Sequence, residues 1–228
     1  MRFIEKEIEA PSFLIHWINE FKKSDLNPTF KDLKGQEKKD FRTILFNEQK
    51  QICCYCEQEI TNDHKSVLEH FLPQSQFKRH ELDYYNLHLS CTHDNQYCDT
   101  SKANDLIVNV LLHPECESFF KYNTYGEILP NTHEYANFKD FLENKKQKKL
   151  RNKHLAIIHL ISVLKLNSES LKNERKKTYN DLLKAKTTLF DTKKKIEDYI
   201  NKEKLKNKSI RFPSLIFYFL NFWKGKLP

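Results

Sequence analysis

The chain has 228 residues, with 39 Lys and Arg against 31 Asp and Glu and a formal net charge of +8. Its hydrophobic content of 39%, with 13% aromatic residues, is typical of a folded globule and argues against a disordered tail. Because only 3 residues are Gly, tight turns are scarce, and a mainly helical fold is favoured over a β-sandwich or barrel. The sequence shows no signal-peptide pattern and no apolar run of the roughly 20 residues that span a membrane, so we expect a cytoplasmic protein.

Two helices are predicted before the first cysteine. Apolar residues recur at helical spacing from Ser12 to Lys23, and Pro11 is placed to begin that helix. A second helix is predicted from about Lys34 to Lys50, with its apolar residues on one side. These helices define an amino-terminal helical segment, residues 1–50.

The middle of the chain, residues 51–130, alternates short extended segments with polar loops. The predicted elements are a knuckle from Ile52 to Ile60, a strand from Ser66 to Phe71, a polar loop from Pro73 to Asp83, an extended segment from Tyr84 to Leu89, and a helix beginning after Cys98. A hairpin is also expected within residues 106–125.

The last segment, residues 131–228, reads as helical. The predicted helices are Asn137 to Leu166, one long helix from Ser168 to about Lys202, and a buried closing helix from about Ile210 to Trp223. The long helix carries Leu182, Leu189 and Ile196 at seven-residue steps, a stripe that we expect to pack against neighbouring helices.

Two pairs of cysteines bracket the predicted strands. Cys53 and Cys56 form a Cys-x-x-Cys knuckle, and Cys91 and Cys98 form a second, more widely spaced pair. Cysteines of an intracellular protein stay reduced, and four thiolates can close a tetrahedral zinc site that serves a structural role. The sequence therefore predicts structural zinc on these four cysteines.

Three alternatives accompany the zinc prediction. Cys54 can replace Cys53 in principle, although the spacing favours Cys53, and His93 can replace one of the later cysteines. Buried thiols without metal are the plainer interpretation. The remaining Cys116 has no partner and is expected in the core.

Polar residues between the two pairs suggest hydrolysis of phosphodiesters, which needs a base to activate water and a divalent ion to neutralise charge. Glu69 and His70 are adjacent in a predicted strand, where neighbouring side chains point to opposite faces. They can serve one site only if the strand bends or ends there, and Pro73 favours such a break.

The motifs from Cys53 to Lys102 resemble those of the HNH, or ββα-metal, endonucleases. They read in order Cys-x-x-Cys, Glu-His-Phe-x-Pro-x-Ser, Tyr-x-Asn-Leu-x-x-x-Cys and Cys-Asp-x-x-Lys. More narrowly, the chain resembles the PtuB-like branch of Septu and retron-linked anti-phage defence systems, which partners an ATPase. The resemblance implies a mainly α fold with a small zinc-stapled ββα-metal core flanked by helices.

The resemblance also implies roles for individual residues. His70 takes the position of the general base, and Glu69 and Asp99 take those of ligands to a catalytic Mg²⁺ or Mn²⁺. Asn86 corresponds to an asparagine that clamps the loop and helps to orient the base, and Lys102 is placed to hold a phosphate.

Asp99 is the main departure from the family pattern, because many HNH enzymes have His or Asn at this position. An oxygen ligand there suits Mg²⁺. Asn95 and His93, in the long spacing between Cys91 and Cys98, remain alternative ligands.

The expected function is therefore that of a metal-dependent DNA endonuclease, the effector of an ATPase-coupled defence complex. The resemblance implies that the carboxyl-terminal helices, especially Leu150 to Lys202, dock the ATPase. No membrane and no small-molecule cofactor are expected, and the net positive charge suits a phosphate backbone. The alternatives are a zinc-stapled nucleic-acid-binding module without catalysis and a helical scaffold that zinc merely stabilises.

Overall fold

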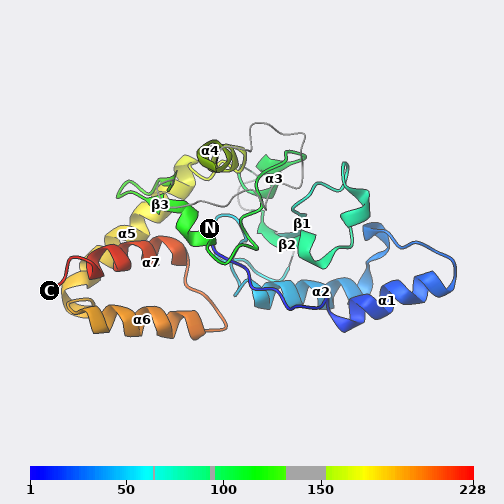
Figure 1. Cartoon of the computed structure of the whole chain (residues 1–228), viewed down its shortest axis with the longest axis horizontal. Coiled ribbons are helices and arrows are strands. Elements are labelled where there is room, and N and C mark those ends of the chain that lie inside the picture. The colour runs from blue at the N-terminus through cyan, green and yellow to red at the C-terminus, as the bar shows by residue number, and fades with distance from the viewer. Residues whose placement is uncertain (64, 93–95, 132–152) are drawn as a thin grey trace.

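The computed structural model describes residues 1–63, 65–92, 96–131 and 153–228. In these ranges, about half of the chain is helical, with seven α-helices and two small antiparallel sheets. The molecule is elongated, with helices at both ends and the sheets between them (Figure 1). No helix within the described ranges is long and apolar enough to cross a membrane.

The two amino-terminal helices form where the sequence predicts them. Helix α1 spans Ser12–Lys23 and follows Pro11, whose carbonyl accepts hydrogen bonds from the first turn. Helix α2 spans Gly35–Glu48 and buries Phe41 and Leu45, its apolar face packing near strand β2. Burial of these apolar side chains stabilises a helix whose outer face is otherwise charged.

The central sheet pairs β1 (Ser66–His70) with β2 (Leu87–Cys91) in antiparallel register, with Glu69 opposite His88. Helix α3 (Asp99–Lys102) follows directly after Cys98, so the chain runs strand, loop, strand and short helix from Ser66 to Lys102. The prediction of extended backbone from Tyr84 was wrong at its start, because Tyr84–Asn86 forms a 3₁₀ turn. Asp83 caps that turn by accepting from the backbone N–H of Tyr85.

A second hairpin pairs β3 (Phe120–Tyr122) with β4 (Ile128–Pro130), so its second strand lies beyond the predicted range. Its turn contains Gly126, which has a positive φ of 81° and packs against the backbone of a later helix. A Cβ at this position would lie 2.2 Å from the carbonyl oxygen of Lys172, so only glycine fits the turn.

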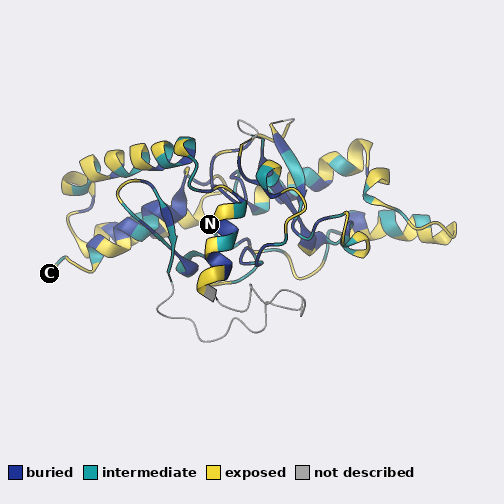
Figure 2. Ribbon diagram, turned by 90° about the horizontal axis from the view of Figure 1, so that it is seen from above, coloured by how far each residue is buried: buried dark blue, intermediate teal, exposed yellow. Residues whose placement is uncertain are grey.

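The carboxyl-terminal helices are α4 (Lys153–Val163), α5 (Glu169–Leu189), α6 (Lys193–Leu205) and α7 (Pro213–Lys224). The helix predicted from Asn137 begins among residues outside the described ranges. Helix α7 buries most of its apolar residues and matches the predicted closing helix. Figure 2 shows buried residues concentrated along the middle of the molecule, with exposed residues on the outer sides of the terminal helices.

The single long helix predicted from Ser168 to Lys202 is in fact two helices, and that prediction was wrong. The chain turns at Phe190, which is buried against the ring of Tyr199, at 5.1 Å between centroids. Thr192 then caps α6 by accepting from the backbone N–H of Lys195. Leu189, expected within the packed stripe, is therefore 58% exposed.

Candidate metal centre and adjoining polar site

The four predicted cysteines form one buried cluster, in which all four sulfur atoms lie within 4.8 Å of one another. Cys53 Sγ lies 3.8 Å from Cys98 Sγ, and Cys56 Sγ lies 3.6 Å from Cys91 Sγ. Bonds of about 2.3 Å to a tetrahedral zinc ion place sulfur atoms about 3.8 Å apart. The cluster can therefore hold a metal ion such as zinc.

The backbone around the cluster explains how distant cysteines meet. The knuckle closes when the N–H of Cys53 donates to the carbonyl of Gln58, at 2.8 Å. The second pair comes from the end of β2 and the start of α3, and the N–H of Cys91 donates to Cys53 Sγ at 3.3 Å. The two pairs thus join the knuckle to β2, which pairs with the strand of Glu69 and His70, and to α3, which carries Asp99 and Lys102.

The alternatives raised for the cluster are partly resolved. Cys54 lies outside it, although its backbone N–H donates to the carbonyl of Leu89. His93 lies outside the described residues. Cys116 is fully buried in the core, as predicted. Burial raises the pKa of Cys56 and Cys98 well above the ordinary thiol value, and a bound metal would favour their thiolate forms.

Glu69 is the buried centre of the polar site. Its Oε1 atom accepts from the hydroxyl of Tyr55 at 2.7 Å and forms an ion pair with Lys102 Nζ at 2.7 Å. Burial raises the pKa of Glu69 to about 8, and a hydrogen bond with Asp99 acts in the same direction, while Lys102 opposes both. Glu69 and Asp99 therefore lie close enough to share a proton or a cation.

His70 lies next to Glu69 but points elsewhere. Its Nε2 atom lies 3.0 Å from the carbonyl oxygen of Glu81, and its ring packs edge-on against Phe30, at 4.4 Å between centroids. A carbonyl can only accept, so Nε2 carries the proton and Nδ1 keeps its lone pair. Burial lowers the pKa of His70, which favours the neutral form that a general base needs.

Asn86 ties the loop after β1 to the start of β2. Its Oδ1 atom accepts from the backbone N–H of Leu72 at 2.6 Å, and its Nδ2 atom donates to the carbonyls of Leu72 and His80, at 3.2 and 3.0 Å. Since His80 immediately precedes Glu81, this clamp also fixes the carbonyl that holds His70. The amide therefore positions the loop and does not face a substrate.

Asp99 and Lys102 come from the two ends of α3. The backbone N–H of Asp99 donates to the hydroxyl of Ser90, at 3.3 Å. Lys102 is fully buried, and its ammonium group lies between Glu69 and the carbonyl oxygen of His70, at 3.0 Å from the latter. In this arrangement Lys102 neutralises Glu69 and is not turned toward solvent.

The structure therefore brings Glu69, Asp99 and Lys102 together, with His70 beside them. In the part of the chain that the structure describes, the four cysteines are the only group of three or more His, Cys, Asp or Glu whose ligand atoms converge, so His70 does not join Glu69 and Asp99 as a third ligand. Asn95, an alternative ligand, lies outside the described residues.

Two site residues were missed by sequence reasoning. Tyr55 lies in the middle of the knuckle, where its position between cysteines gave no hint that its hydroxyl reaches Glu69. His88 lies opposite Glu69 in the sheet and is fully buried, and neither ring nitrogen has a hydrogen-bond partner within the described residues. Strand alternation could have placed His88 on the face of Glu69, once the register was known.

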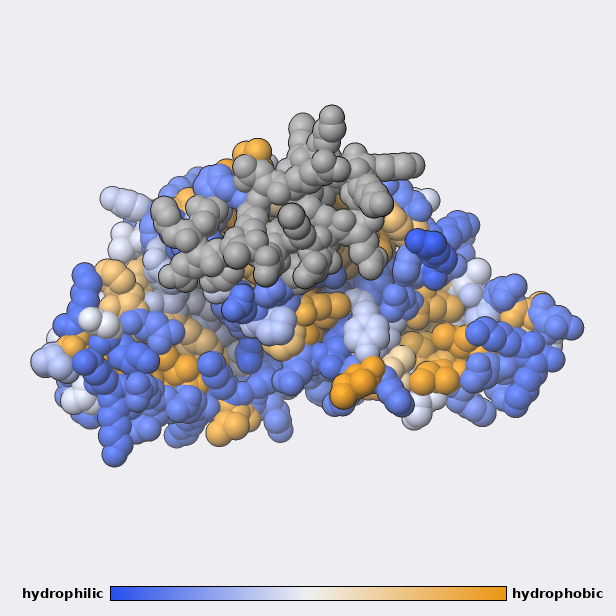
Figure 3. All heavy atoms as spheres, in the orientation of Figure 1, coloured by the Kyte–Doolittle hydropathy of each residue, from blue (hydrophilic) through white to orange (hydrophobic). Residues whose placement is uncertain are grey.

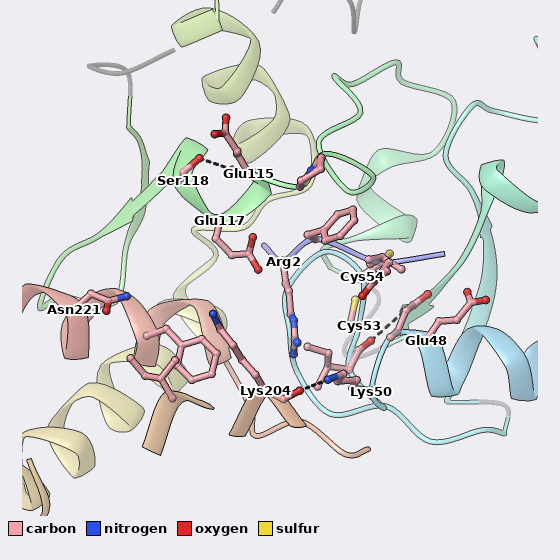
Figure 4. Close-up of a pocket in the computed structure, with 18 residues that line it drawn as sticks. Arg2, Glu48, Lys50, Cys53, Cys54, Glu115, Glu117, Ser118, Lys204 and Asn221 are labelled. Carbon is pink, nitrogen blue, oxygen red and sulfur yellow. Dashed lines mark hydrogen bonds between the residues drawn. The ribbon is translucent and has the colours of Figure 1, made fainter. Parts of the chain in front are cut away.

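A pocket of about 580 Å³ borders the cysteine cluster (Figure 4). It is lined by residues that include Arg2, Cys53, Glu117 and Lys204, and by none of the candidate catalytic residues. The pocket therefore touches the metal centre at Cys53, whereas the polar site around Glu69 lies outside it.

Comparison with known proteins adds no assignment. No model of a known protein family matches the chain, and no curated protein matches it significantly.

Proposed function

We propose that this protein is a metal-dependent endonuclease of the HNH type, which hydrolyses phosphodiester bonds in DNA. The observation that carries the proposal is a group of polar side chains, with His70 next to Glu69, Asp99 and Lys102. These residues lie on a strand, loop, strand and short helix, which the four clustered cysteines connect to the knuckle. The motif resemblance supports the same assignment and suggests an effector subunit of an ATPase-coupled anti-phage complex, similar to PtuB.

His70 would act as the general base. Its Nε2–H donates to the carbonyl of Glu81. Nδ1, which keeps its lone pair, is therefore the atom that would accept a proton from the attacking water. Asn86 supports this orientation, because its amide ties down the loop that carries Glu81.

Glu69 and Asp99 are the residues that would hold a catalytic Mg²⁺ or Mn²⁺. Their donor set fits such an ion, because hard divalent cations prefer carboxylate oxygens and these two carboxyl groups are already within hydrogen-bonding reach. When bound, the ion supplies positive charge that stabilises the phosphate during the reaction. Tyr55 and Lys102 hold Glu69 in place and balance part of its charge.

The four cysteines would hold structural zinc. Four thiolates leave no open coordination position, so zinc here would not take part in the reaction. It would fix the end of β2 and the start of α3 against the knuckle, and thereby set the spacing between Glu69 and Asp99.

One observation favours a second candidate, a zinc-stapled nucleic-acid-binding module without catalysis. Glu69 is buried and already neutralised by Lys102, an arrangement that also stabilises a protein with no catalytic metal. Such a module would bind DNA and carry zinc without cleaving.

Incubation of supercoiled plasmid with the wild-type protein, in the presence of Mg²⁺, Mn²⁺ or a chelator too weak to remove structural zinc, distinguishes the two. The nuclease proposal predicts nicked or linear DNA that depends on the added ion. DNA that is bound but left intact under all three conditions, also after an ATPase partner has been added, supports the binding module.

A further inference from the structure

The charge of the chain is divided unevenly along its length. Residues 169–228 carry 16 Lys and Arg against 7 Asp and Glu, whereas residues 51–130, which hold the candidate site, carry 5 against 12. A polyanion is repelled by an acidic module and attracted by a basic one. The part of the protein that holds the candidate catalytic residues is therefore the part least suited to retain nucleic acid on its own.

The positive charge lies on helices α5, α6 and α7, which together with their connections we name the basic arm (residues 169–228). Six of its seven carboxylates already pair with a Lys or Arg of the arm itself. Lysines therefore remain in excess. Those that are exposed and have no carboxylate partner within the described residues include Lys176, Lys177, Lys193, Lys194, Lys202 and Lys204.

Backbone hydrogen bonds attach the basic arm to residues on either side of the cysteine knuckle. The N–H of Ser209 donates to the carbonyl of Lys50 at 2.9 Å, and the N–H of Phe212 donates to the carbonyl of Glu57 at 3.1 Å. Figure 4 shows the side chain of Lys50 bonded to the backbone of Lys204 beside the knuckle. A ligand held on the arm is therefore held in a fixed position relative to the candidate site.

We propose that the basic arm binds the sugar-phosphate backbone of nucleic acid and retains it for the candidate site. That this nucleic acid is also the substrate depends on the proposed nuclease function. That the arm binds it depends only on the distribution of charge. The core of a protein–protein interface is depleted in Lys and rich in aromatic residues. The surface over α6 is instead largely hydrophilic (Figure 3), and its lysines are spread over two helices, as suits a repeating line of phosphates.

The test measures binding and not cleavage. The full chain carrying His70→Ala is titrated against a fluorescent DNA duplex of mixed sequence, by anisotropy, from about 50 to 200 mM potassium chloride. The arm variant adds Lys176→Gln, Lys177→Gln, Lys193→Gln and Lys194→Gln. The matched control instead adds Lys22→Gln, Lys31→Gln, Lys34→Gln and Lys39→Gln, which removes the same charge from exposed positions near α1 and α2.

The arm variant is expected to bind at least tenfold more weakly than its parent. The slope of its affinity against salt concentration, both on logarithmic scales, should fall by up to about 0.9 for each phosphate that the arm no longer neutralises. The control is expected to stay within about threefold of the parent.

Weakened binding by the arm variant alone supports the proposal whether or not the wild-type protein cleaves DNA, so failure of the nuclease assignment leaves it standing. Unchanged affinity in the arm variant, or an equal reduction in the control, would overturn it, and would leave a protein partner as the occupant of these helices.

Discussion

Lys102 Nζ lies 2.7 Å from Glu69 Oε1, and both side chains are almost wholly buried, at 1% and 4% exposed. The pair joins α3 to β1, and it sets the charge at the centre of the candidate site. A buried charge without its partner is costly, whereas a surface pair contributes little. This ion pair is therefore open to a direct test of stability.

Lys102→Met is expected to lower the free energy of unfolding by up to about 3 to 5 kcal/mol, because Glu69 loses its cation and must stay buried either as an unpaired carboxylate or, since burial already raises its pKa to about 8, in its protonated form. Urea denaturation followed by circular dichroism measures the change. Lys23→Met, which removes a surface lysine paired with Glu20, serves as control and is expected to leave stability nearly unchanged. Adding Glu69→Gln to Lys102→Met should recover part of the stability, and no recovery would show that the two groups are not coupled.

The composition of the cysteine cluster predicts that Cys56 is needed for metal binding and that the nearby Cys54 is not. Cys56→Ser is expected to lose bound metal and to unfold, because it removes one of four converging sulfur atoms. Cys54→Ser, two residues earlier and outside the cluster, should retain the metal. Metal content per chain, measured with a zinc-sensitive dye after gel filtration, checks both variants. Equal metal content in the two would contradict the assignment of Cys56, and not Cys54, as a metal ligand.

The clamp made by Asn86 predicts a local loss of order. Asn86→Ala removes three hydrogen bonds and leaves partly buried backbone groups of Leu72 without these partners, so it is expected to destabilise the protein by about 1 to 3 kcal/mol. Hydrogen exchange should quicken in residues 72–83 before it quickens in α7. Uniform quickening over the whole chain would contradict a local role.

The buried imidazole of His88 predicts that the stability of the fold depends on pH. Burial lowers the pKa of His88 well below its ordinary value. In the unfolded chain the pKa of His88 is about 6.5, so just below this pH the unfolded chain binds a proton that the folded chain does not. The unfolded state then binds more protons below that pH, and stability falls as pH falls.

His88→Phe is expected to be at least as stable as the wild type at neutral pH, because neither ring nitrogen has a partner within the described residues. Its advantage should grow below about pH 6.5, by up to about 1.4 kcal/mol for each pH unit. Urea titrations of both proteins at several pH values measure this difference. A constant difference would show that His88 does not titrate in this way.

Local signals in the sequence were sufficient for much of the fold. Pro11 and the apolar spacing after it predicted α1. The Cys-x-x-Cys spacing correctly favoured Cys53 over Cys54 as a member of the cluster. Both depend on interactions between near neighbours. The break after Leu189 was missed because the seven-residue spacing continues through it, while the capping by Thr192 and the burial of Phe190 decide the outcome.

The residues of the candidate site were predictable only in part, because Tyr55 and His88 were missed, and its geometry was not predictable. Motif order placed Glu69, His70 and Asp99 together, yet it could not show that Lys102 turns inward to Glu69 or that Glu81 holds His70. Both interactions join residues more than ten positions apart, through loop conformations that no local pattern specifies.

The most direct measurement is cleavage of supercoiled plasmid by His70→Ala beside the wild type, in Mg²⁺ and in Mn²⁺. His16→Ala, which removes a histidine that is 76% exposed on α1, is the matched control. All three proteins should be folded and carry the same amount of zinc. The proposed mechanism predicts cleavage by the wild type and by His16→Ala, and a rate at least about 100-fold lower in His70→Ala. Equal rates in all three proteins would contradict it.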